Sequence, residues 1–236
     1  WREAFAYLAS KPNLRTFFSS NGSLWTDDDI EYVLDVGVDH IQISINGSDM
    51  ETHQKLRLND EYEKIASVPL RLIRRRQERG LDKPAVQVCN TFNERNEKDR
   101  DAYLKYWLPR VDQVTAGPES QYVGDPGRLN RIWFSVNSMV KMPVDAERFP
   151  CTQLKQFSWI MADGSAKPCL TQMKTEIGSV YDTSIEGILA SDIRQQYISD
   201  HAVSKFDNGV CNECNEWHSQ IFVKNIETED YRLIQS

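Results

Sequence analysis

The cysteines constrain this chain of 236 residues more than any other feature of its sequence. Four of the five cysteines come after residue 150, at Cys151, Cys169, Cys211 and Cys214, and the last two form a Cys-x-x-Cys pair. Their odd number and the lack of a signal-like opening segment argue against the disulfide framework of a secreted protein. We therefore expect these thiols to bind a metal ion or cluster in a reducing compartment, which predicts a cytoplasmic protein.

Three interpretations of the four cysteines remain open from the residues alone. They can be buried free thiols, they can hold one structural Zn²⁺ as four tetrahedral ligands, or they can hold an iron–sulfur cluster. Zinc ribbons usually offer two Cys-x-x-Cys pairs, whereas a predicted hairpin separates the first two cysteines here. The wide spacing favours a cluster, because a cluster presents several irons. Cys89 stands apart on a predicted strand and is expected in the core.

The sequence around these cysteines predicts a small α+β domain. Residues 157–161 and 166–170 are expected to pair as a β-hairpin across the turn residues Asp163 and Gly164. Ser184 is a good N-cap for the helix that follows, and we expect this helix to pack on the hairpin.

The first half of the chain alternates strands and helices. Four runs read as strands, at residues 15–20, 40–45, 85–89 and 112–116. Helical stretches separate them, at residues 26–37, 49–79 and 98–111. Strands separated in this way pair in parallel, so the fold class is α/β, and an open sheet and a barrel both remain compatible.

Two helices in this half carry local signals. Thr26 is an N-cap followed by acidic residues, and Gly37 ends the same helix. Pro69 lies inside the long helical stretch and is expected to kink or split it.

Polar residues recur where the strands end, at the edge where parallel sheets bind ligands. Turn formation explains any one of them, but their recurrence after three successive strands indicates a binding edge. The residues are Ser19, Ser20, Asn21, Ser44, Asn46, Asn90 and Thr91.

Charge and composition exclude two classes of partner. The net charge is −7, which argues against a nucleic-acid binder, because such proteins neutralise phosphates with basic residues. No apolar run approaches the ~20 residues that a membrane span needs. The arginines between Arg71 and Arg79 can bind a phosphate or an acidic partner, but such a run is more typical of a solvated outer helix face.

The cysteine-containing tail resembles the SPASM/twitch extension of radical SAM enzymes. The resemblance lies in Cys151, residues 159–169 (WIMADGSAKPC), residues 177–180 (IGSV), the helix start at Ser184 and the final Cys-x-x-Cys pair. It implies one auxiliary [4Fe–4S] cluster held by Cys151, Cys169, Cys211 and Cys214.

The first half is similar to the later strands of the radical SAM partial (β/α) barrel. Ser20-Asn21-Gly22 and residues 37–47 (GVDHIQISING) resemble the motifs after its third and fourth strands. The resemblance implies that Arg57 reaches the methionyl carboxylate of S-adenosylmethionine and that Ser44 contacts its polar end. It also places Asn21, Asn46 and Val88 at this cofactor, with Val88 near the adenine.

The sequence departs from this family at Asn46, which replaces the commoner Asp of the fourth-strand motif, and more strongly in two missing motifs. The Cys-x₃-Cys-x₂-Cys loop that binds the SAM-cleaving [4Fe–4S] cluster and a Gly-Gly-Glu-Pro stretch are both missing from residues 1–236. Together with Trp1 and an uncapped first helix, this predicts an N-terminally truncated piece of a longer parent. We expect residues 1–117 to form the later part of the barrel, 118–150 a linker and 151–236 the SPASM/twitch domain.

The resemblance implies the activity of the parent. It would cleave S-adenosylmethionine and abstract a hydrogen atom from a peptide or from a sugar or aminocyclitol, with flavodoxin or ferredoxin as reductant. The chain alone, without the SAM-cleaving loop, is expected to hold only the auxiliary cluster. The alternatives are a non-catalytic binding module with a structural Cys₄ zinc site and a degenerate member that has lost its radical site.

Overall fold

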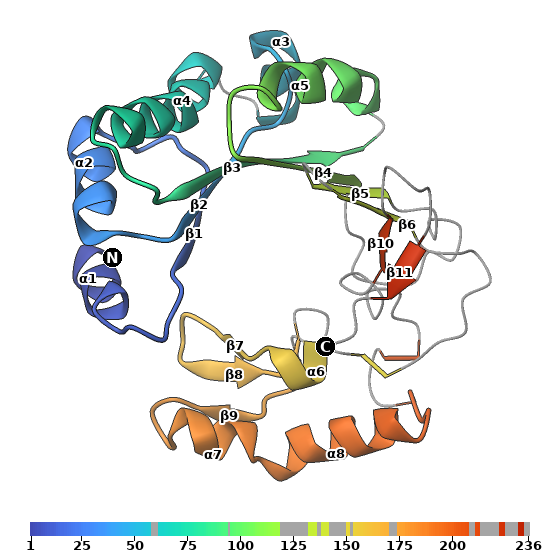
Figure 1. Cartoon of the computed structure of the whole chain (residues 1–236). Helices are drawn as coiled ribbons and strands as arrows, with labels where there is room; N and C mark the ends of the chain where they lie inside the picture. Colours follow the sequence, from blue (N-terminus) through green and yellow to red (C-terminus); the bar gives the residue numbers. More distant parts are fainter. Residues whose placement is uncertain are drawn as a thin grey trace. The chain divides into compact units, whose positions relative to one another are not determined.

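The computed structural model describes residues 1–57, 61–93, 95–118, 132–135, 138–141, 150–151, 153–169, 174–207, 211–212, 222–224 and 231–233 (Figure 1). The chain divides into two units, formed mainly by Trp1–Glu119 and by Val140–Lys224.

The first unit contains four parallel strands that neighbour one another in sequential order. They are β1 (Phe17–Ser20), β2 (His40–Ser44), β3 (Ala85–Phe92) and β4 (Gln113–Pro118). Each adjacent pair is parallel, in a register that sets Ile43 of β2 beside Val88 of β3. The predicted strands and their parallel pairing are confirmed.

Helices lie outside this row of strands (Figure 1). They are α1 (Arg2–Ala9), α2 (Asp27–Val36), α3 (Met50–Arg57), α4 (Tyr62–Glu78) and α5 (Arg100–Trp107), with a short 3₁₀ turn, η1 (Glu97–Asp99), before α5. Alternate residues of β2 and β3, such as Ile41, Ile43 and Val86, join helix residues such as Leu72 and Trp107 in one buried core. The other face of β2 carries His40, Gln42 and Ser44, which are half-buried. The sheet therefore has an apolar, helix-covered face and a polar face.

The predicted ends of α2 are confirmed. The Thr26 side chain accepts a hydrogen bond from the backbone N–H of Asp29, and the Asp29 carboxylate accepts one from the backbone N–H of Thr26. Gly37 ends the helix in the left-handed conformation, with φ of 77°. Both ends of α2 therefore have capping hydrogen bonds from residues close in the sequence.

Pro69 does not split α4, so this part of the prediction is wrong, whereas the alternative, a kink, stays a prediction. The helix runs without a break from Tyr62 to Glu78, and Pro69 is among its buried residues. Packing of the proline ring in the core offsets the loss of one backbone hydrogen bond.

The segment 118–150, interpreted from the sequence as a linker, contains regular structure. Strands β5 (Ile132–Ser135) and β6 (Ser138–Lys141) follow β4 in the sheet order, and β5 pairs antiparallel with β4. The segment is therefore more than a connection, and the domain boundaries at 117 and 151 stay predictions.

The second unit confirms the predicted hairpin. Strands β7 (Trp159–Ile160) and β8 (Ser165–Lys167) pair antiparallel, and β9 (Gly178–Ser179) adds a third strand. The predicted single helix is two helices, α7 (Ile185–Leu189) and α8 (Asp192–Ala202), and a short helix, α6 (Gln153–Gln156), follows Cys151. Ile188 of α7 packs on Ala166 of the hairpin, as expected. Strands β10 (Phe222–Lys224) and β11 (Tyr231–Leu233) form an antiparallel pair.

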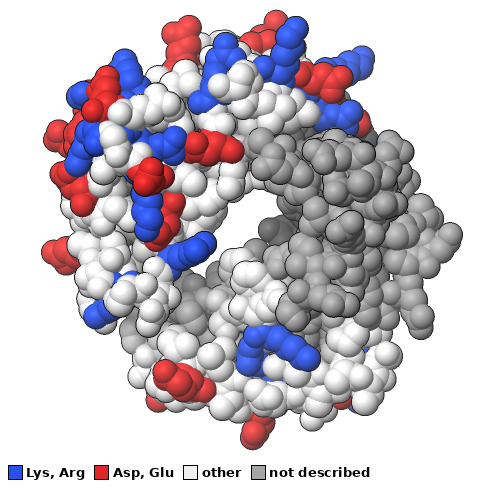
Figure 2. Space-filling model, in the orientation of Figure 1, with Lys and Arg blue, Asp and Glu red and all other residues white. Residues whose placement is uncertain are grey.

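Arginines of α4 form ion pairs with acidic residues of α2. They lie on the outer face of the helix, as the sequence predicted. Basic and acidic side chains alternate over this part of the surface (Figure 2). The pairs, with their N–O distances, are Arg71–Asp27 at 2.6 Å, Arg75–Glu31 at 3.0 Å and Arg79–Asp35 at 2.7 Å. Among the described helices, none combines the length and apolar character needed to cross a membrane.

Candidate functional site

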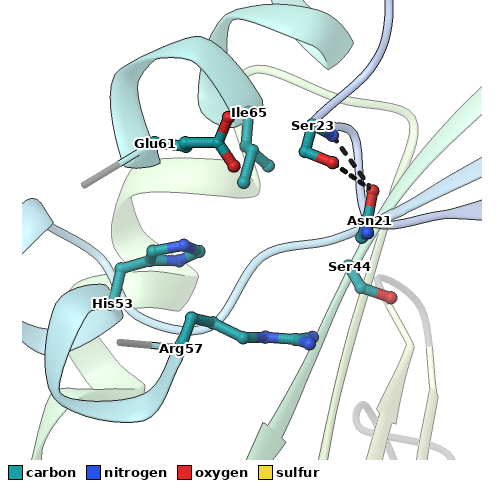
Figure 3. A pocket seen from close by; sticks show the side chains of 7 residues that line it. All are labelled: Asn21, Ser23, Ser44, His53, Arg57, Glu61 and Ile65. Atoms are coloured by element: carbon teal, nitrogen blue, oxygen red, sulfur yellow. Dashed lines mark hydrogen bonds between the residues drawn. The ribbon is translucent and has the colours of Figure 1, made fainter. Parts of the chain in front are cut away.

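A small pocket opens at the carboxyl ends of β1 and β2 (Figure 3). It encloses about 60 Å³, enough for a carboxylate-sized group and much less than a pocket for a whole cofactor, which takes ~300 Å³ or more. Its lining comes from the strand ends and from the α3–α4 region: Asn21, Ser23, Ser44, His53, Arg57, Glu61 and Ile65.

The turn after β1 forms one wall of the pocket. The Asn21 Oδ1 atom accepts hydrogen bonds from the backbone N–H of Ser23 at 3.1 Å and from its hydroxyl at 2.9 Å. Gly22 has φ of 80°, and a Cβ at this position would lie 3.0 Å from Cγ2 of Ile65. Glycine therefore lets α4 approach the end of β1 and makes the pocket narrow.

Side-chain hydrogen bonds from two other elements hold the loop after β2 in place. Asp99 accepts hydrogen bonds from the backbone N–H of Ser48 at 2.6 Å and from its hydroxyl. The Tyr62 hydroxyl donates to the carbonyl of Ser48, and burial raises the pKa of Tyr62 well above its usual value, so the phenol stays a neutral donor. Gly47, with φ of 111°, turns the chain from Asn46 into α3. The loop thus fixes where Asn46 and α3 lie.

Arg57 brings a positive charge to the pocket from the end of α3. Its Nε atom donates to Oδ1 of Asn46 at 2.6 Å, and its guanidinium extends toward Ser44 (Figure 3). Its two Nη groups have no hydrogen bond to a described residue. A guanidinium held by Nε presents these Nη groups to a planar, two-oxygen anion.

Two further donors face the same pocket. In the described part of the chain, neither Nδ2 of Asn21 nor the hydroxyl of Ser44 has a hydrogen-bond partner. With the Arg57 guanidinium they form a set of donors suited to a carboxylate.

The structure brings together four of the five residues predicted at S-adenosylmethionine. Asn21, Ser44 and Arg57 line the pocket, and Asn46 holds Arg57. Val88 does not join them: it is fully buried in the helix-covered core, with 0% exposure. The strand register explains this difference, because Val88 lies beside Ile43 and side chains alternate between the two faces of a strand.

Sequence reasoning missed four lining residues: Ser23, His53, Glu61 and Ile65. His53 is almost fully buried, and its ring lies 5.5 Å from that of Tyr62. A signal for it was present, because His53 and Arg57 are four residues apart and so share one face of α3. Ile65 gave no such signal, since an isoleucine at helical spacing is expected in the core.

The predicted cluster ligands lie in the second unit, where two of them share one apolar environment. Cys211 is buried with Leu154 and Tyr197, and Cys151 packs against this group. The backbone N–H of Cys151 donates to Nδ1 of the buried His201 at 3.3 Å. Residues far apart in the chain are thus brought to one place by α6 and α8.

Cys169 follows the hairpin strand β8 and is buried, with 9% exposure. Within the described ranges, no three His, Cys, Asp or Glu side chains form a group that could hold a single metal ion. Cys214, the fourth predicted ligand, lies outside the described residues.

Cysteine thiols in apolar surroundings have the chemistry that an iron–sulfur cluster requires. Clusters are held by cysteine thiolates, and apolar surroundings control the access of water and the reduction potential. Cys151 and Cys211 offer thiols in such surroundings. Cys89, in contrast, lies on β3 of the first unit, where burial raises the pKa of its thiol and disfavours the thiolate that a metal needs.

Comparison with known protein families gives a match in the second unit. Residues 151–215 match the family model SPASM, described as an iron–sulfur cluster-binding domain. The matched range contains all four predicted ligands, including Cys214. A search of curated proteins gives no match to this chain. The chain therefore contains a SPASM iron–sulfur domain after its parallel α/β unit.

Proposed function

We propose that the protein acts as a radical SAM enzyme whose SPASM domain holds an auxiliary [4Fe–4S] cluster on Cys151, Cys169, Cys211 and Cys214. The observation that carries this proposal is the SPASM match over residues 151–215, which spans all four cysteines. The pocket at the strand ends adds a second, independent reason, because it offers hydrogen-bond donors to a carboxylate.

The residues of the cluster site have two tasks in this proposal. The four thiolates hold the iron, and the apolar group around Cys211, with Leu154 and Tyr197, keeps water from it. When bound, a [4Fe–4S] cluster supplies one-electron transfer at a potential that burial and hydrogen bonds to sulfur adjust.

The pocket in the first unit is proposed to bind the amino-acid end of S-adenosylmethionine. The Arg57 guanidinium would pair with the carboxylate through its Nη groups, and Ser44 and Asn21 would donate to the same end of the molecule. The volume of about 60 Å³ suits this end alone, so the remainder of the cofactor would extend beyond the pocket.

The SAM-cleaving loop is not among residues 1–236, so the proposed activity belongs to the whole reading frame that contains these residues. That protein would carry a second [4Fe–4S] cluster and would take electrons from flavodoxin or ferredoxin in the cytoplasm. The proposed substrate is a peptide, a sugar or an aminocyclitol, from which a hydrogen atom is abstracted.

The test is reductive cleavage of S-adenosylmethionine by the protein made from its whole reading frame and purified without oxygen. We expect formation of 5′-deoxyadenosine and methionine when dithionite is supplied, together with iron, sulfide and an absorbance near ~400 nm. One zinc per chain with no such absorbance would identify a structural Cys₄ zinc site instead. Iron and sulfide without any cleavage would leave an iron–sulfur protein that lacks the radical activity.

A further inference from the structure

Three asparagines connect the end of β3 to Arg57. Asn96 donates from Nδ2 to Oδ1 of Asn90 at 3.4 Å, and Asn46 donates from Nδ2 to the same oxygen at 3.3 Å. Asn46 in turn accepts from Nε of Arg57 at 2.6 Å. Asn90 and Asn96 are each 1% exposed, so the inner part of this chain of amides is closed to water.

Backbone groups fix which way the chain of amides points. Oδ1 of Asn96 accepts from the backbone N–H of Asn93 at 2.8 Å, and its Nδ2 also donates to the carbonyl of Thr91 at 3.1 Å. A backbone N–H can only donate and a carbonyl can only accept, so the amide of Asn96 has one allowed orientation. Its Nδ2 must therefore face Asn90.

The orientation of the Asn96 amide determines those of Asn90 and Asn46, and through them the hydrogen bond to Arg57. Asn90 must meet the Nδ2 of Asn96 with its oxygen, and the same oxygen faces Asn46. Asn46 then presents its own Nδ2 to Asn90, which leaves its oxygen for Arg57. Each amide thus determines the orientation of the next one.

We propose that Asn90 and Asn96 are positioning residues that act through Asn46 to hold the Arg57 guanidinium for a carboxylate ligand. The ligand part of this statement rests on the proposed function, in which that carboxylate belongs to S-adenosylmethionine. The chain of hydrogen bonds from Asn96 to Arg57 carries the positioning part by itself.

The chain of hydrogen bonds explains why an uncharged residue, Asn46, stands between Asn90 and Arg57. An aspartate there would turn an oxygen toward Oδ1 of Asn90, and two acceptors repel each other. It would also pair its charge with Arg57 and compete with the carboxylate of a ligand. The neutral amide of Asn46 orients Arg57 and leaves its charge for the ligand.

An aspartate at position 90, unlike one at position 46, keeps the hydrogen-bond acceptor that the neighbouring amides need. Asn90 uses only its oxygen in the chain, and its Nδ2 has no hydrogen-bond partner among the described residues. An aspartate at this position keeps the accepting oxygen, whereas a leucine of similar size removes it. The two positions therefore differ in a way that packing alone does not predict.

The test measures the binding of S-adenosylmethionine and of its decarboxylated analogue to four variants of the whole, cluster-loaded protein. We expect Asn90→Leu and Asn46→Asp to weaken S-adenosylmethionine binding by about tenfold, the usual effect of one lost hydrogen bond to a charged group. The exposed control Asn13→Leu should bind it as the unchanged protein does, and Asn90→Asp, which keeps the accepting oxygen, should lose less affinity than Asn90→Leu. Binding of the decarboxylated analogue should stay the same in all four.

Equal losses for both ligands in Asn90→Leu, or unchanged S-adenosylmethionine binding in Asn46→Asp, would overturn the proposal. A second measurement does not depend on this ligand: the hydrogen exchange of the Arg57 Nε–H group, followed by ¹⁵N NMR. We expect faster exchange in Asn90→Leu than in Asn90→Asp and an unchanged rate in the control Asn13→Leu, and equal exchange rates in all three variants would contradict the positioning role. If the unchanged protein binds neither ligand, the proposed function fails, and the exchange measurement still decides the positioning role.

Discussion

Arg57 carries the positive charge of the pocket, and its fork of donors is what distinguishes it from a lysine. We predict that Arg57→Lys weakens the binding of S-adenosylmethionine by about tenfold or more, because an ammonium cannot replace a two-point contact with a carboxylate. Equilibrium dialysis under anaerobic conditions measures the dissociation constant. The matched control is Arg74→Lys on the outer face of α4, where the side chain is 65% exposed. An equal dissociation constant for Arg57→Lys and the unchanged protein would show that Arg57 does not contact the ligand.

Asp112 is a second residue whose negative charge matters, because it contributes to the stability of the first unit. Burial raises the pKa of its carboxyl, but the hydrogen bonds from Arg76 at 2.6 Å and from the backbone N–H of Val86 at 2.7 Å outweigh it, so the pKa lies below its usual value. A lowered pKa stabilises the folded state above the unfolded pKa of about 4, and this contribution is lost as the pH falls through the folded value.

We predict that Asp112→Asn lowers the free energy of unfolding by about 1 kcal/mol at neutral pH, a value discounted because the Asp112 side chain is 34% exposed. The difference from the unchanged protein should shrink below about pH 4. Urea unfolding at several pH values measures it. Asp101→Asn, at a side chain that is 93% exposed, is the control and should change little. A difference that grows toward acid pH would contradict the assigned direction.

At the scale of the elements, the turn between β2 and α3 matters most for the pocket, because it fixes the position of α3, which carries His53 and Arg57. A Cβ on Gly47 would lie 2.9 Å from the backbone nitrogen of His53 and from Cβ of Thr52, at a φ of 111°. Gly47→Ala should therefore cost about 2 kcal/mol or more in the free energy of unfolding, from strain and contact together.

Gly37→Ala is the matched comparison for this turn. Gly37 also has a positive φ, of 77°, but nothing lies within 4 Å of its added Cβ. We expect it to cost only about 1 kcal/mol, the conformational part alone. Equal losses of stability in the two variants, measured by urea unfolding, would mean that the close contact at Gly47 contributes nothing.

The sequence predicted the elements well where their signals are local. The Thr26 cap, the Gly37 end and the Asp163-Gly164 turn each act within a few residues, and all appear in the structure. Pro69 misled the prediction because its effect depends on tertiary packing, which burial in the core supplies.

The site was only partly predictable for the same reason. Asn21, Ser44 and Arg57 stand at the ends of elements, where residue type and position already indicate binding. Glu61 reaches the pocket only because α4 starts beside α3, and Asn96 orients Asn90 only because η1 brings it back to β3. The side chain of Val88 faces the core because of the strand register, which a residue motif alone does not define.

At the scale of the whole molecule, the chain combines two units that differ in how they are held together. The first has one large apolar core between its sheet and its helices. The second has only small groups of buried side chains among the described residues, such as Ala166 with Ile177 and Ile188. A small domain with little core gains stability from a bound metal centre, so the cluster is expected to hold the second unit together.

The most direct test of the central claim is the iron and sulfide content of single cysteine variants, purified without oxygen. We predict that Cys151→Ala, Cys169→Ala, Cys211→Ala and Cys214→Ala each lose about one cluster's share of iron and sulfide. Cys89→Ala, at a half-buried thiol of the first unit, should keep the full content. Unchanged iron in the four variants, or a loss in Cys89→Ala alone, would contradict the assignment of these cysteines as the ligands of an iron–sulfur cluster.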